Sequence, residues 1–67
     1  MIENRVSNMI GARKMTIAEV AHLTGLSYNA VANIYYGKTK SIDFETLNKL
    51  CFALDCTTND IFTYIPD

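Results

Sequence analysis

The 67-residue sequence contains no tryptophan, one proline, one histidine and two cysteines. Two cysteines, Cys51 and Cys56, are too few for a disulfide framework, so we expect both to be reduced, with Cys51 a small buried hydrophobe. The single histidine, His22, has no partner at metal-ligand spacing, and we expect it on the surface rather than at a metal. No catalytic triad, paired-carboxylate cleft or glycine-rich phosphate loop is recognisable. These absences favour a protein that is not an enzyme and that carries no cofactor.

Long apolar runs are also missing. No segment approaches the roughly 18 consecutive apolar residues that span a bilayer. The first ten residues include the acidic Glu3 and have no apolar stretch typical of a signal peptide, so we expect a cytoplasmic protein with no membrane partner. A chain of this length buries only about 60% of its unfolded surface, which predicts one small domain over residues 1–67 with regular helix packing or a partner subunit. Little room is left for a small-molecule substrate pocket.

The formal net charge of −1 conceals a strong segregation of charge along the chain. From Arg5 to Lys40 the local charge is +4, whereas from Ser41 to Asp67 it is −4. Phosphate binding depends on local positive potential rather than on the total charge. The first two thirds of the chain is therefore compatible with nucleic-acid binding, and an ordinary solvated helical surface is the alternative.

Apolar residues recur at helical spacing almost throughout, and no segment reads as a strand. We predict an all-α fold of five helices: residues 2–13, a second helix to about residue 23, residues 28–36, a fourth helix ending near residue 54, and a short fifth helix. The starts are marked by cap residues, namely Thr16 with Glu19, Ser27, Asp43, and Thr57 with Asp60. Hydrophobic staple pairs support three of them: Met15 with Val20, Ile42 with Leu47, and Cys56 with Ile61. The predicted core is Val20, Ala21, Leu26, Val31, Ile34, Leu47, Leu50 and Leu54.

Residues 16–36 have the spacing of a helix-turn-helix. Two helices that cross through a short turn need a small residue at their contact, which Ala21 supplies, and a glycine at the bend, which is Gly25. Leu26 then plugs the turn, and Val31 and Ile34 present apolar side chains toward the first helix. Gly37 is placed to end the second of these helices.

With these residues in place, the chain resembles the Cro/CI-type (XRE) family of phage repressors. The similarity covers nearly all of residues 2–62, including the run from Thr16 to Ala21, the turn from Thr24 to Ser27, the segment Gly37–Lys40 and the closing Asp60–Phe62. The resemblance implies a compact five-helix domain that acts as a sequence-specific regulator of transcription, probing double-stranded DNA with its third helix in the major groove. Members usually bind as symmetric homodimers. The sequence departs from the family pattern at Ile17, where a glutamine is usual, and at Tyr28, where a small polar residue is common.

The predicted DNA contacts follow from position on the third helix, residues 27–36. The exposed face at its N-terminal end carries Tyr28, Asn29 and Asn33, which we expect to contact bases, since an asparagine can bond both N6 and N7 of adenine. The expected phosphate contacts are Thr16, Ser27, Lys38, Thr39, Lys40 and Arg13. The alternative is that the asparagines are solvated helix surface and that residues 38–40 form an ordinary polar loop.

Two further alternatives remain open at this point. The apolar tail of Phe62, Tyr64 and Ile65 either folds back onto the core or buries a dimer interface. The leading functional hypothesis is an operator-binding regulator, a repressor or an activator, of which we expect the repressor. The second is an antitoxin-like or adaptor module whose main partner is a protein, because Ile17, Tyr28 and Tyr36 make the expected DNA face unusually apolar.

Overall fold

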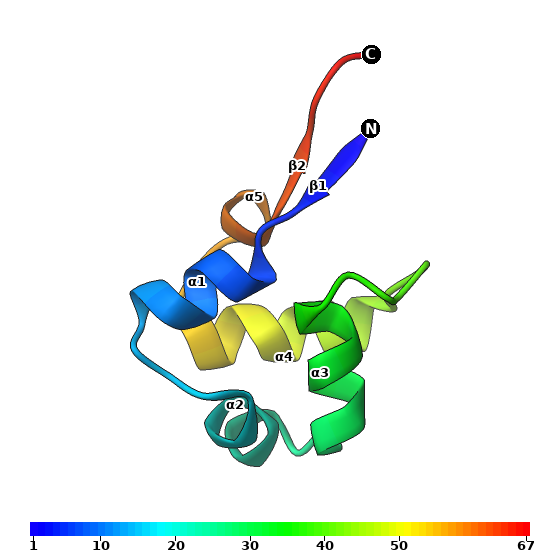
Figure 1. Ribbon diagram of the computed structural model, residues 1–67. Helices are drawn as coiled ribbons and strands as arrows, with labels where there is room; N and C mark the ends of the chain where they lie inside the picture. Colours follow the sequence, from blue (N-terminus) through cyan, green and yellow to red (C-terminus); the bar gives the residue numbers. More distant parts are fainter.

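The computed structural model describes residues 1–67 as five helices and one two-stranded sheet. The elements follow in the order β1 (Ile2–Asn4), α1 (Val6–Ala12), α2 (Ile17–Thr24), α3 (Tyr28–Tyr35), α4 (Phe44–Leu54), α5 (Thr58–Ile61) and β2 (Phe62–Tyr64). The helices pack into one body, and the ribbon of β1 and β2 leaves it with both chain termini at its far end (Figure 1). No helix has the length and apolar character that crossing a membrane requires.

The prediction of five helices is confirmed, whereas the all-α fold class and the start of the first helix are wrong. Residues 2–4 form an antiparallel strand whose register pairs Ile2 with Tyr64 and Asn4 with Phe62. The backbone N–H of Arg5 then donates to the carbonyl of Ile61 at 2.7 Å. Helical periodicity could not reveal this pairing, because the partner strand lies about sixty residues away in the sequence.

Asn4 explains why α1 begins at Val6 rather than at residue 2. Its side-chain oxygen accepts a hydrogen bond from the backbone N–H of Val6 at 2.9 Å. Its side-chain nitrogen donates to the carbonyl of Ile34, near the end of α3, at 2.8 Å. One short side chain therefore joins β1, the start of α1 and the end of α3.

The predicted caps are confirmed at the starts of the later helices. The hydroxyl of Thr16 accepts from the backbone N–H of Glu19 at 3.1 Å, and the carboxylate of Glu19 accepts from the N–H of Thr16 at 2.9 Å. The carboxylate of Asp43 accepts from the N–H three residues further on at 2.7 Å. At the start of α5, the N–H of Thr57 donates to the carboxylate of Asp60 at 2.8 Å. Each bond satisfies a backbone or side-chain group that the helix itself leaves free.

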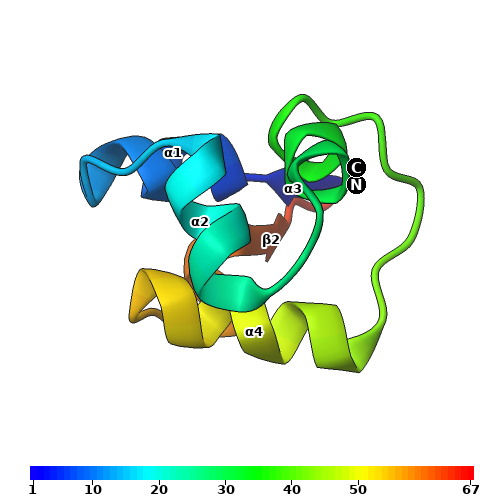
Figure 2. The ribbon, with the colours of Figure 1, turned by 90° about the horizontal axis from the view of Figure 1, so that it is seen from below.

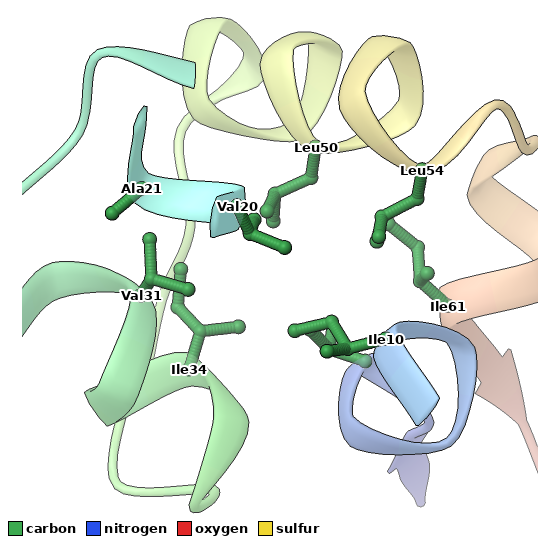
Figure 3. Packing of buried hydrophobic residues seen from close by; sticks show 9 residues of the cluster. Ile10, Val20, Ala21, Val31, Ile34, Leu50, Leu54 and Ile61 are labelled. Atoms are coloured by element: carbon green, nitrogen blue, oxygen red, sulfur yellow. The ribbon is translucent and has the colours of Figure 1, made fainter. Parts of the chain in front are cut away.

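The core joins all five helices. Its nine buried members are Val6, Ile10, Val20, Ala21, Val31, Ile34, Leu50, Leu54 and Ile61. Figure 3 shows Val20 of α2 beside Leu50 of α4, with Ile10 pointing toward them from α1. Of the eight predicted core residues, Leu26 and Leu47 are only half-buried against this cluster.

Two smaller predictions about burial are resolved by the same packing. Cys51 is half-buried rather than buried. In the tail, Phe62 packs against the core, while Tyr64 and Ile65 remain exposed. The tail therefore folds back over part of its length only.

Candidate nucleic-acid interface

The turn between α2 and α3 is held by its own backbone and by one hydroxyl. Gly25 has a φ of +75°, in the left-handed region that suits glycine, and its N–H donates to the carbonyl of Ala21 at 2.9 Å. The buried hydroxyl of Thr24 donates to the carbonyl of Val20 at 2.8 Å and accepts from the N–H of Leu26 at 3.2 Å. These contacts fix the angle at which α3 leaves α2.

One face of α3 belongs to the core and the opposite face is open. Val31 and Ile34 are buried, whereas Tyr28, Asn29 and Asn33 are exposed, as the sequence predicts. The helix starts at a cap in which the hydroxyl of Ser27 accepts from the N–H of Ala30 at 3.0 Å. Figure 2, in which α3 is seen nearly end-on, shows α2 beside it and the loop from α3 to α4 running along the outer edge of the molecule.

The loop that carries Lys38, Thr39 and Lys40 starts on the last turn of α3. Gly37 has a φ of +72°, and the N–H of Lys38 donates to the carbonyl of Asn33 at 2.9 Å. All three loop residues are exposed. The ion pairs of the protein lie elsewhere and involve the N-terminal amine, Arg5 and Lys49, so both loop lysines are available to a ligand.

Residues 5–67 match the family of Cro/C1-type HTH DNA-binding domains. The chain belongs to this family. It is also 34% identical over 59 residues to YozG of Bacillus subtilis (strain 168), which is described as an uncharacterized HTH-type transcriptional regulator. That alignment covers 88% of this chain and 70% of the relative. The resemblance inferred from the sequence is thus confirmed, and the α2–turn–α3 unit is the helix-turn-helix of a Cro/C1-type domain.

In this Cro/C1-type domain, Asp43 and Asp60 each accept hydrogen bonds at the start of a helix. The hydrogen bonds from Thr46 hold the pKa of the Asp43 carboxyl below its usual value. The pKa of Asp60 is lowered in the same way by its hydrogen bonds from Thr57. Both carboxylates therefore stay charged at neutral pH while they satisfy helix N-termini. Burial, followed by the neighbouring Cys51, raises the pKa of the Cys56 thiol, which favours its protonated form.

Arg13, a predicted phosphate contact, has a structural role in the domain. Its guanidinium donates to the carbonyls of Leu54 at 2.8 Å and Asp55 at 2.9 Å. These carbonyls lie at the C-terminal end of α4. The loop with Lys38 and Lys40 leads into the N-terminal end of the same helix, so Arg13 and the two lysines lie at opposite ends of α4. The arginine thus satisfies groups at a helix C-terminus, and we leave it outside the interface proposed below.

A hollow of about 330 Å³, here called the tyrosine hollow, lies between the start of α2 and α3. Its walls include Ile17, Tyr28, Tyr35 and Tyr36. The rings of Tyr35 and Tyr36 meet edge to face with centroids 4.9 Å apart. Ile17 is half-buried and packs against the core, so the position where family members usually have glutamine is partly an extension of the core here.

Sequence reasoning missed two residues that position the interface. Thr24 was read as part of the turn motif, without its hydrogen bonds, and Asn4 was placed inside a helix. A threonine directly before the turn glycine is a usable signal, because its hydroxyl can bond the preceding turn of helix and the following N–H. The bond of Asn4 to the N–H of Val6 is local, but its bond to Ile34 could not be predicted, since that partner is thirty residues away.

Proposed function

We propose that this chain is a transcriptional regulator that recognises a specific double-stranded DNA sequence with α3 in the major groove. One observation carries the proposal: the face of α3 opposite the buried Val31 and Ile34 exposes polar side chains beside a loop with two unpaired lysines. A groove-reading helix needs this division, because its inner face must anchor it while its outer face contacts base edges.

Base recognition is assigned to Asn29 and Asn33, with Tyr28 beside them. Residues four apart lie on one helix face, about 6 Å apart along the axis, which spans roughly two base-pair steps. Each amide can bond an adenine through N6 and N7, and Tyr28 can pack on a thymine methyl group or bond a phosphate. Such a contact discriminates its base by about 1–3 kcal/mol.

Phosphate binding is assigned to the loop of Lys38, Thr39 and Lys40 and to the helix starts at Thr16 and Ser27. Both cap hydroxyls accept a backbone hydrogen bond, which leaves their own hydrogens free to donate. Contacts of this kind fix the register of a protein on DNA and add affinity for every sequence alike.

The proposal includes repression by a homodimer. Two copies related by a two-fold axis would read the two halves of a palindromic operator, one α3 in each major groove. A bound dimer would exclude other proteins from the promoter it covers.

The decisive experiment is selection of bound sequences from a random duplex library, followed by titration of the selected and the scrambled duplex at one salt concentration. We expect a palindromic consensus and a preference of at least a thousandfold for it. Equal affinity for both duplexes would refute sequence-specific recognition.

The tyrosine hollow favours a second candidate, a module that binds a protein through its exposed aromatic residues. The two functions differ in their dependence on salt. Failure to bind any duplex in low salt, where phosphate contacts are strongest, would favour the protein partner.

A further inference from the structure

A single phenylalanine protrudes from the first turn of α4. Phe44 is 89% exposed, the largest value among the large apolar side chains of the protein. Scattered apolar residues on a surface are ordinary, but a phenylalanine exposed to this extent keeps most of its apolar area in water. A contact that covers this ring would therefore be favourable.

An apolar hollow of about 520 Å³ lies beside it, between the β1–β2 ribbon, the end of α3 and the start of α4. We call this space the ribbon hollow. Its apolar lining consists of Ile2, Ile34, Ile42, Leu47 and Phe62. Ile2 is 62% exposed at the outer wall, and Ile42, Leu47 and Phe62 are half-buried. The hollow is thus a partly solvated apolar surface that is large enough to receive an aromatic ring.

The protruding ring and the hollow are neighbours on one surface. Phe44 comes two residues after Ile42 and three before Leu47, and positions i and i+3 adjoin on a helix. Figure 1 shows the end of α3, the loop and the start of α4 on the same side of the molecule. A protrusion next to a matching hollow is what a two-fold contact requires, since each copy offers both halves of the contact.

We infer that a second copy of this chain places its Phe44 in the ribbon hollow, while its own hollow receives Phe44 of the first copy. The charges agree with this occupant. Phe44 is flanked by Asp43 and by Glu45, which also forms an ion pair with Lys49 at 3.3 Å, whereas Lys40 lines the rim of the hollow. In the two-fold contact, the carboxylate of Asp43 approaches Lys40 of the other copy, so opposite charges meet at the rim of each hollow.

The contact is small for a specific interface. A phenylalanine buries about 150–250 Å², and two of them with the walls of two hollows stay near the low end of specific interfaces, about 1,200 Å² in total. We therefore expect a dimer that dissociates at low protein concentration. Because Lys40 lines the hollow, the contact lies beside the loop to which phosphate binding is assigned.

Self-association without DNA tests this interface independently of the proposed function. Sedimentation equilibrium over a range of protein concentrations should show a monomer–dimer equilibrium, and Phe44→Asp should raise the dissociation constant by about tenfold or more. Phe52→Asp is the matched control, because Phe52 lies on the same helix, is 78% exposed and does not line the hollow. Both variants should keep the melting temperature of the monomer. A wild-type chain that stays monomeric at every concentration, or an equal effect of the two substitutions, would overturn the proposal.

A mixture of two variants tests the reciprocal geometry. Ile2→Lys blocks the hollow of one copy, and Phe44→Asp removes the protruding ring of the other. In the mixed dimer, the intact Phe44 meets an intact hollow, and the new aspartate meets the new lysine. We expect each variant alone to be monomeric and the mixture to form a heterodimer. A mixture that remains monomeric would contradict the two-fold contact. Dimers without DNA binding would leave the interface standing and refute the operator-binding function instead.

Discussion

Replacing Thr24 by valine should loosen the turn that sets the angle of α3. Valine has a methyl group of similar size in place of the hydroxyl, so the substitution removes one hydrogen-bond donor and acceptor without opening a large cavity. Three hydrogen bonds disappear: the hydroxyl donates to the carbonyls of Val20 at 2.8 Å and Ala21 at 3.2 Å, and it accepts from the N–H of Leu26 at 3.2 Å. The carbonyl of Val20 remains inside a helix, whereas the N–H of Leu26 is left half-buried without an acceptor. An unsatisfied donor of this kind costs about 1–3 kcal/mol.

For a domain of this size, 1 kcal/mol shifts the melting temperature by about 4–8 °C. We therefore expect Thr24→Val to melt roughly 5–20 °C below the parent. Its free energy of unfolding, measured in urea, should fall by about 1–3 kcal/mol. The matched control is Thr39→Val in the exposed loop, which should change stability by less than about 0.5 kcal/mol. An unchanged melting temperature in Thr24→Val would refute the claim that this hydroxyl holds the turn.

Three further predictions concern DNA binding and pH. Replacing Lys38 and Lys40 together by alanine should weaken binding to all duplexes alike and lower the slope of log affinity against log salt by about two. An unchanged slope would show that neither lysine contacts a phosphate. Asn29→Ala should cost about 1–3 kcal/mol against the selected duplex and little against a scrambled one, and equal losses on both would identify a phosphate contact instead. The third prediction follows from the lowered pKa of Asp43, whose stabilising charge is present above its unfolded pKa of about 3.9 and is lost as pH falls through the lower folded value. Asp43→Asn keeps the cap but cannot titrate, so urea midpoints of this variant should fall less steeply than those of the parent below about pH 4. Parallel curves for the two proteins would contradict that role.

Local signals were sufficient for the helix-turn-helix. Three local features set its geometry: the caps at Thr16 and Ser27 and the glycine at position 25. Each acts within four residues of the chain, so neighbouring residues determine it. Helical periodicity then placed Val31 and Ile34 inside and Asn29 and Asn33 outside, as the structure has them. The candidate site could be read from the sequence because it lies on one short helix with a single buried face.

Contacts between distant segments could not be predicted from such local signals. Residues 2–4 continue a helical pattern in the sequence, and only the backbone of residues 62–64 makes them a strand. In the sequence, Arg13 looks like a cation that is free to bind phosphate. In the structure, its guanidinium donates to two carbonyls at the end of α4, at 2.8 and 2.9 Å. In both cases the deciding partner is more than forty residues away, and its position depends on the packing of the whole core.

The sequence by itself determined where α2, α3, α4 and α5 begin, which face of α3 is open and which family the chain resembles. Those properties follow from periodicity, capping and turn chemistry, all of which act over a few residues. Only the tertiary structure decided that the termini pair as a ribbon and that an apolar hollow opens beside Phe44. The hollow exists because Ile2, Ile34, Leu47 and Phe62 converge from four separate elements, and convergence of this kind is created by packing rather than by any local pattern.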